Sequence, residues 1–527
     1  MNRLVLALSA AVFLHAQPPE TILINGKILT VDARNSIQQA LAIRDGKITA
    51  LGTTAAIRPT AAPSTRIIDL GGRTVIPGLI DSHMHAIRAA LSFSTEVNWI
   101  GARSIPEAMR RISAAAKAKP AGSWLIVAGG WTADQFTQRR APTQAELIAA
   151  APMNPVYVQL GYSWAILTPA GYAKLGELPP GLTPDAKNPG AVNGGQPAIV
   201  ALFDKLPKPT PDQQLEGTKL FFTELNRLGI TGVVDPGGNN LFPSDYQAVQ
   251  TVWRNGQLSV RVAFSLGAQI AGDEFNDFQN QTRFLPAGFG DDYLRFTGIG
   301  ERITATMNNN DRPTADQKEK YLQIARWAAA RGMALTMHWP NNSSVGELLG
   351  IFETVNKDIP ITDLRWSIAH LGDASEATMQ RMKSLGIGWT MQNGSYFGAS
   401  PNEKLPALNT ARRVGLHVGA GTDAHRVMSY NPFSALQWML DGKTVAGAQI
   451  AGMTEVPSRE EALRLYTLGS AWFSKDDTKR GSLEVGKYAD LVVLTKDYLT
   501  IPVSEIGNLE SVLTIVGGKA VFSASPF

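Results

Sequence analysis

The chain has 527 residues, of which 44% are hydrophobic and 18% charged, and a formal net charge of +4. This length is too great for one ordinary domain, and the composition supplies ample apolar material for a large core. The 49 Lys and Arg residues are dispersed and form no basic run with interleaved aromatic residues, so we expect no nucleic-acid partner. The absence of cysteine excludes disulfides, thiolate metal sites and a cysteine nucleophile.

The N-terminal residues have the pattern of a targeting segment. Arg3 precedes an apolar run, 4–14, that is well short of the roughly 20 residues needed to span a membrane. We therefore expect residues 1–16 to be a secretory signal peptide, cleaved after Ala16, and the protein to be exported to the periplasm or secreted. A buried N-terminal helix is the alternative. No later segment is long and apolar enough to cross a membrane, so we expect no membrane anchor.

Short β-rich runs occupy both ends of the mature chain. Residues 17–73 contain TILINGKILTVD and ALAIRDGKITALGT, whose NGK and DGK tripeptides predict hairpin turns. Residues 481–527 contain similar short β-rich runs, for example GSLEVGKYADLVVLT. We therefore expect one small β-sandwich domain that is composed of both termini.

Residues 74–480, between these ends, alternate β-like runs with helical stretches, which is typical of an α/β fold. The β-like runs are the one that ends at Asp81 and those at 230–236, 259–266, 294–301, 333–339, 364–370, 387–392 and 417–423. Helical segments such as 316–332 and 375–386 lie between them and end in glycine. Eight strands with intervening helices predict a (β/α)₈ barrel of the TIM type, with a long insertion, about 86–229, after the first strand.

Polar residues follow the expected strands at their C-terminal ends, where the chemistry of such barrels lies. The first strand leads to His83 and His85, and four others end in Glu301, His338, His370 and Asp423. The chain has seven histidines, and five of them, including His425, fall at or just past these ends. Random scatter rarely gives that pattern, so we expect a single site.

Imidazole and carboxylate ligands suit zinc, which we expect here, and also Mn, Fe or Ni. His83 and His85 share one face of an extended segment, so both can bind one divalent ion, with Asp423 completing its shell. His338 and His370 can hold a second ion, with Glu301 as the bridge. Two ions about 3.5–4 Å apart would activate a water molecule and polarise a substrate carbonyl. Asp423 would take the proton of that water and pass it to the leaving amine.

Several stretches resemble one known family. VIPGLIDSHMH, RWSIAHL, GAGTDAH and the tail GSLEVGKYADLVVL look like the amidohydrolase superfamily, specifically the YtcJ-like metal-dependent hydrolases of amidohydrolase family 3. The resemblance extends over nearly all of the mature chain, because GGWTADQF and PTQAELIAAAPMNPVYVQL resemble the insertion of that family. It implies a metal-dependent hydrolase that cleaves a carbon–nitrogen bond of amide, N-acyl or N-formyl type in a small-molecule substrate.

The sequence also departs from this family near the expected site. Relatives often carry a lysine at the end of strand four that can be carboxylated to bridge two metals, whereas GIGERITATMNNN offers only Glu301. Relatives often show a substrate-facing histidine in the insertion, where GYSWAILTPAGY places Tyr162. The metal ligands are thus retained, while positions that contact substrate have changed.

Four residues are candidates for substrate contact: Trp131, Gln135, Tyr162 and His425. Trp131 suits the pocket and the core of the insertion equally well. His425 suits either a substrate contact or the capping of a loop.

Two alternatives to the two-ion hydrolase stay open. The first is a deaminase or cyclic amidase of the same superfamily with one ion, held by His83, His85, His338 and Asp423, while His370 polarises the substrate. The second is a non-catalytic, metal-containing binding relative, suggested by the missing lysine. A homo-oligomer is compatible with the sequence.

Overall fold

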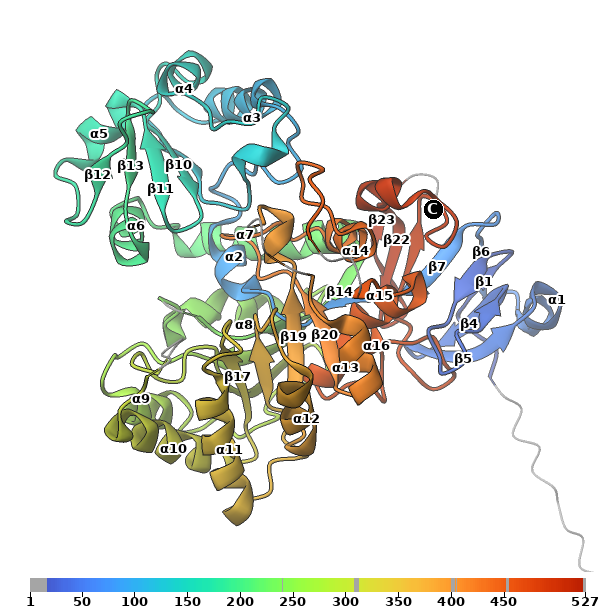
Figure 1. Cartoon of the computed structure of the whole chain (residues 1–527). Helices are drawn as coiled ribbons and strands as arrows, with labels where there is room; N and C mark the ends of the chain where they lie inside the picture. The colour runs from blue at the N-terminus through green and yellow to red at the C-terminus, as the bar shows by residue number, and fades with distance from the viewer. Residues whose placement is uncertain are drawn as a thin grey trace, which may run out of the picture.

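Eight parallel strands form the sheet at the centre of the molecule (Figure 1). The structure is a computed structural model that describes residues 17–524 except 239, 308–311, 400–402, 404 and 452–454. The strands neighbour one another in chain order and are β8 (Leu79–Asp81), β14 (Ile230–Asp235), β15 (Arg261–Leu266), β16 (Leu294–Ile299), β17 (Ala334–His338), β18 (Ser367–Ala369), β19 (Gly388–Gln392) and β20 (Val418–Gly421). Each falls within an expected run, so the predicted barrel is confirmed. The expected signal peptide, 1–16, lies outside the described residues.

The first and last strands of this sheet, β8 and β20, meet and close the barrel. The backbone N–H of Ser82 donates to the carbonyl of Ala420 at 3.0 Å, and that of Asp423 donates to the carbonyl of His83 at 2.8 Å. Both hydrogen bonds lie at or just past the C-terminal ends of the strands. Closure therefore brings the ligand-bearing ends of β8 and β20 together.

Helices cover the outside of the barrel and connect its strands. They are α2 (Ala86–Ser92), α7 (Pro211–Arg227), α8 (Gln247–Arg254), α9 (Glu274–Gln281), α10 (Ala315–Ala330), α11 (Val345–Asp358), α12 (Glu376–Ser384), α13 (Leu408–Val414), α14 (Pro432–Asp441), α15 (Arg459–Leu465) and α16 (Leu468–Phe473). Gly332 and Gly386 follow α10 and α12 with φ of +67° and +66°, a conformation that glycine adopts at little cost. In the described part of the chain, no helix combines the length and apolar character needed to cross a membrane.

Strands from both termini build a β-sandwich beside the barrel (Figure 1). One sheet contains β1 (Thr21–Ile24), β4 (Ala40–Arg44), β5 (Lys47–Gly52) and β6 (Arg66–Asp69), and the short helix α1 (Thr54–Ile57) packs against it. The other contains β2 (Lys27–Leu29), β3 (Ile37–Gln38), β7 (Thr74–Pro77), β21 (Leu491–Leu494), β22 (Ser511–Val516) and β23 (Lys519–Ser523). Leu23, Leu41 and Val493 belong to the buried cluster that the two sheets share. β7 pairs with β21, so the sandwich includes residues just past the boundary expected at residue 73.

A separate α/β unit follows α2 and forms the insertion. Its sheet contains β9 (Leu125–Val127), β10 (Val156–Leu160), β11 (Trp164–Leu167), β12 (Thr183–Pro184) and β13 (Ala191–Asn193), and its helices are α3 (Ile105–Ala118), α4 (Gln144–Ala150), α5 (Pro169–Leu175) and α6 (Gln196–Asp204). Figure 1 shows this unit at the end of the barrel toward which β17, β19 and β20 point. Because α2 and α7 contact each other and β14, the ends of the expected insertion range, 86–229, belong to the barrel.

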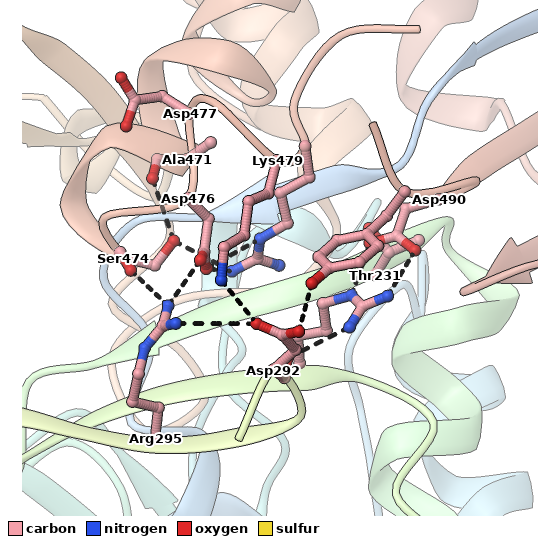
Figure 2. Close-up of polar contacts among 12 residues, drawn as sticks. Thr231, Asp292, Arg295, Ala471, Ser474, Asp476, Asp477, Lys479 and Asp490 are labelled. Carbon is pink, nitrogen blue, oxygen red and sulfur yellow. Dashed lines mark hydrogen bonds and ion pairs between the residues drawn. The ribbon is translucent and has the colours of Figure 1, made fainter. Parts of the chain in front are cut away.

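Charged side chains fasten the C-terminal segment to the opposite end of the barrel (Figure 2). Arg261 at the start of β15 pairs with Asp490 at 2.7 Å, and both side chains are 3% exposed. Arg295 in β16 pairs with Asp476 at 2.6 Å. These pairs, the first buried and the second partly buried, hold the base of the barrel, away from the end where the expected ligands lie.

Candidate metal centre

The six side chains expected as metal ligands converge at the C-terminal end of the barrel. They follow or end five of the strands: His83 and His85 after β8, Glu301 after β16, His338 in β17, His370 after β18 and Asp423 after β20. Because the strands are parallel, these ends meet at one mouth. Ligands that are far apart in the sequence therefore lie close together in space.

The carboxylate of Glu301 lies at the centre of this cluster. Its Oε2 is 3.2 Å from His83 Nε2, 3.3 Å from His338 Nδ1 and 3.6 Å from His370 Nε2. Its Oε1 is 3.3 Å from His85 Nε2. One carboxylate therefore contacts four imidazoles, which is a suitable position for an acid that bridges ligands from different strands.

Asp423 approaches the same histidines from the last strand. Its Oδ1 lies 3.2 Å from His85 Nε2 and 3.6 Å from His83 Nε2. Two sets of three ligand atoms, each within 4.8 Å of one another, are present: His83–Glu301–His370 and His83–His85–Asp423. Both sets contain His83, whereas the sequence analysis grouped Glu301 and His370 on an ion without it.

The histidine ring nitrogens have surroundings that suit a metal. Among the described residues, neither nitrogen of His83 nor Nε2 of His370 has a hydrogen-bond partner, and all three atoms are buried. A buried polar atom without a partner costs about 1–3 kcal/mol, and coordination of a cation removes that cost. Imidazoles and carboxylates without thiolates suit zinc, and also Mn, Fe or Ni. The residues present therefore fit the expected metal.

Charge is concentrated in the cluster. Burial acts to lower the pKa of His83 and His85, but the neighbouring carboxylates of Glu301 and Asp423 raise these values to about 9 and about 10. Burial acts to raise the pKa of Glu301, but the charge of His85 and the other imidazoles hold it well below its usual range. The carboxylates thus stay ionised and attract positive charge, either protons or a metal ion.

Hydrogen bonds fix the orientation of the ligands from β8. Nδ1 of His85 lies 2.7 Å from the carbonyl oxygen of Gly237, which aims Nε2 at the carboxylates. The buried carboxylate of Asp81 accepts from the backbone N–H of His83 at 2.9 Å and from the hydroxyl of Thr422 at 2.7 Å. Asp81 therefore connects the ligand-bearing ends of the first and last strands.

The structure places two of the candidate substrate contacts in the insertion, outside the cluster. Trp131 is 1% exposed, and its indole donates to the carbonyl of Gln159 at 2.7 Å within the core of the insertion. The amide of Gln135 donates to the carbonyls of Trp99 at 3.0 Å and Ala102 at 2.8 Å. Gln135 also lines a cavity of about 990 Å³ whose walls include none of the six expected ligands.

His425 is buried where the insertion meets the barrel. Its Nε2 lies 3.1 Å from Oε2 of Glu96, and the guanidinium of Arg426 lies 3.3 Å from Oε1 of the same carboxylate. This arrangement suits the loop-capping role, because Glu96 holds the segment that follows Asp423. The sequence analysis missed Glu96, which is 329 residues from His425 along the chain.

Tyr162, the fourth candidate, is half-buried and interacts electrostatically with Arg88. Arg88 was also missed. Its position in the sequence could have indicated that it lies near the site, because a residue three positions after His85 lies about one helical turn further along α2.

A second cavity, of about 930 Å³, opens onto the cluster. His370 and Asp423 form part of its wall, together with the apolar side chains of Phe397, Met428 and Trp438. A cavity of this volume that combines apolar and polar side chains is suitable for a small molecule. We take this cavity as the candidate substrate pocket.

Residues 66–522 match the Amidohydrolase family. The chain belongs to this family. An N-substituted formamide deformylase from Arthrobacter pascens is 26% identical over 550 residues, which cover 95% of this chain and 98% of that protein. The putative amidohydrolase YtcJ from Bacillus subtilis (strain 168) is 21% identical over 540 residues, which cover 95% and 99%. The resemblance noted in the sequence is confirmed, and membership supports a hydrolase that acts on carbon–nitrogen bonds.

A solved structure shares the fold of this amidohydrolase. An uncharacterized metal-dependent hydrolase from Pyrococcus horikoshii OT3 superposes with a TM-score of 0.66 and 20% sequence identity, over 92% of this chain and 99% of that chain. The likeness extends through the barrel, the sandwich and the insertion, since nearly the whole of both chains is covered.

Proposed function

We propose that this amidohydrolase hydrolyses the amide, N-acyl or N-formyl bond of a small molecule, so that an amide and water give a carboxylic acid and an amine. The observation that carries the proposal is the contact of one carboxylate, Glu301, with four imidazoles beside Asp423. The adjoining cavity of about 930 Å³ has room for such a substrate. Similarity to an N-substituted formamide deformylase supports this bond type.

The six clustered residues would hold a divalent metal, for which we propose zinc. When bound, the metal polarises the carbonyl of the scissile bond and lowers the pKa of the attacking water. Glu301 keeps the histidines in place, since its two oxygens contact imidazoles from β8, β17 and the end of β18.

Asp423 would move the proton in this reaction. Burial acts to raise its pKa, but the contacts with His83 and His85 hold the pKa well below its usual range, so the carboxylate is ionised, which is the form that a proton acceptor needs. It takes one proton from the attacking water and donates it to the amide nitrogen as the carbon–nitrogen bond breaks. The water oxygen then remains on the acid, and the amine leaves neutral.

Two carboxylates approach the same nitrogen of His83, which favours a second candidate, a centre with one metal ion. Glu301 and Asp423 both approach His83 at Nε2, and one ring nitrogen binds one ion. A single ion is the arrangement expected for the alternative function, a deaminase or cyclic amidase of the same superfamily. The metal content per chain separates the two candidates: two equivalents support the bridged pair, and one equivalent supports the alternative.

The test of the proposed function compares Asp423→Asn with Asp363→Asn, a control in the exposed turn before β18. Zinc-loaded protein is assayed on formamides, N-acyl amino acids, cyclic amides and esters. We expect Asp423→Asn to lower kcat by about 10²- to 10⁴-fold, the usual contribution of a positioned acid–base group, and Asp363→Asn to change nothing. Absence of turnover by the wild-type protein on every amide, or an Asp423→Asn variant that is as active as the wild type, contradicts the proposal.

A further inference from the structure

Arg88 is a charged side chain close to the metal cluster. It lies on α2, which begins directly after His85 and sits between the barrel and the insertion (Figure 1). Its side chain is half-buried, and its Nε is buried without a hydrogen-bond partner. In the described part of the chain, the guanidinium forms neither an ion pair nor a hydrogen bond.

The glycine at position 238 shows how close Arg88 lies to the ligands. A methyl group built on Gly238 would lie 3.3 Å from Nη1 of Arg88 and 3.3 Å from Nδ1 of His85. The guanidinium and the His85 ring therefore both lie against Gly238, where a larger side chain would crowd them. Burial acts to lower the pKa of Arg88, but Tyr162, Glu301 and the other nearby acids raise it, so Arg88 stays charged.

Tyr162, in the insertion, interacts with the same arginine. It lies in the turn between β10 and β11, is half-buried, and is close enough to the guanidinium to interact with it electrostatically. Its hydroxyl has no hydrogen-bond partner among the described residues. Two groups that can donate hydrogen bonds, one of them charged, thus interact electrostatically, and neither has an acceptor among the described residues.

A fixed cation next to a metal centre favours the binding of an anion. A partly buried charge without a partner is costly, and a metal ion in the cluster would repel the guanidinium further. The planar guanidinium matches a carboxylate with two parallel hydrogen bonds, and a tyrosine hydroxyl can donate a third. The anion must also lie close to the reacting bond, because Arg88 and the ligand His85 both lie against Gly238.

We propose that Arg88 and Tyr162 bind the carboxylate of the substrate, so that the enzyme prefers N-acyl or N-formyl amino acids over amides of uncharged amines. This inference rests on the proposed function. In such a substrate the carboxylate is attached to the carbon that bears the scissile nitrogen, so it sits within a few bonds of the reacting carbonyl. That short separation matches the position of Arg88, which lies against Gly238 together with His85. The cavity that Phe397 and Met428 line meets the cluster at His370 and Asp423, so the remaining side chain of the substrate can extend into it.

A purely electrostatic role is the competing explanation. If Arg88 only offsets the negative charge of Glu301, Asp423 and Asp235, its removal changes metal affinity and the acidity of water in the site. Those changes affect every substrate alike. A role in binding the carboxylate affects only substrates that carry one, so a matched pair of substrates separates the two explanations.

The experiment measures kcat/KM of zinc-loaded protein for paired formamides that differ only by the carboxylate. The pairs are N-formyl-phenylalanine with N-formyl-2-phenylethylamine, and N-formyl-alanine with N-formyl-ethylamine, with both enantiomers of each acid. Charged hydrogen bonds contribute about 1.5–3 kcal/mol, so we expect the wild type to prefer the acid by about 10- to 100-fold. Arg88→Met should abolish the preference by lowering kcat/KM for the acid alone. Arg88→Lys should keep part of it, and Tyr162→Phe should lower it by a smaller factor.

Arg110→Met, which removes an exposed arginine of α3 in the insertion, is the control and should keep the full preference. An equal loss on both members of a pair in Arg88→Met, or a wild type that prefers the uncharged formamides, overturns the proposal. If no formamide is hydrolysed, the proposed function fails for this class, and calorimetric binding of N-formyl-phenylalanine then decides about Arg88. Binding that Arg88→Met weakens at least tenfold supports the carboxylate site, and equal binding by both proteins overturns it.

Discussion

Replacement of Glu96 by glutamine tests how the insertion is held over the site. Glu96 pairs with His425 at 3.1 Å and with Arg426 at 3.3 Å, and all three side chains are less than 10% exposed. Burial acts to raise the pKa of Glu96, but the charge of Arg426 and the hydrogen bond from His425 lower it from 4.5 to about 2. At 1.36 kcal/mol per pKa unit, the ionised carboxylate stabilises the folded protein by about 3 kcal/mol at neutral pH.

The pH dependence has a defined sign, because the folded pKa of Glu96 is lower than the unfolded one. Its contribution is complete above about pH 4.5 and is lost as the pH falls toward 2, with about 1.4 kcal/mol already lost at pH 3.5. We therefore expect Glu96→Gln to destabilise the protein by about 3 kcal/mol at pH 7, and by less at pH 3.5. Urea unfolding followed by tryptophan fluorescence at both pH values measures the difference.

Glu146→Gln is the matched control within the same insertion. The pKa of Glu146 is also lowered to about 2, chiefly by its hydrogen bond with Arg140, but these side chains are 30% and 46% exposed. Solvent screens such a pair, so we expect a loss below about 1 kcal/mol. A Glu96→Gln effect that is no larger than that of Glu146→Gln, or that is the same at pH 7 and pH 3.5, refutes the reasoning.

Three further predictions concern the base of the barrel, the metal and the N-terminus. Asp490→Ala leaves the buried charge of Arg261 without its partner and should lower the free energy of unfolding by about 3–5 kcal/mol, measured by thermal unfolding. The control, Glu505→Ala in an exposed pair, should lower it by less than about 1 kcal/mol. Equal effects of the two substitutions would contradict a stabilising role of the buried pair. Glu301→Gln should weaken zinc binding about 10- to 100-fold in a chelator competition, because it removes the carboxylate that contacts four imidazoles, and unchanged binding would show that Glu301 is no ligand. N-terminal sequencing of protein exported from a Gram-negative host should begin at Gln17, and an intact Met1 in the cytoplasm would contradict the signal peptide.

The barrel and the cluster were predictable because their signals are local in the sequence. Each strand is a short apolar run, and His338, His370 and Asp423 stand at or just past the ends of such runs. In a parallel barrel, position at a strand end is enough to predict that side chains meet. The glycine after α10 likewise marked the end of that helix by its need for a positive φ.

Contacts between distant segments were not predictable from the sequence. Glu96 meets His425 across 329 residues, and nothing near either residue indicates the other. Trp131 was ambiguous because an aromatic side chain suits a pocket wall and a core equally, and its surroundings depend on how the insertion folds. Grouping the histidines by ion also required distances, since only the structure shows that both carboxylates approach His83.

The metal content of the purified protein, measured on the same samples as hydrolysis of the amide panel, tests the central claim most directly. The account predicts one or two equivalents of zinc per chain, loss of that zinc and of activity in His83→Gln and His85→Gln, and activity in proportion to the zinc restored after chelation. A protein that binds no stoichiometric metal, or that keeps its metal and its activity in both histidine variants, would contradict the account.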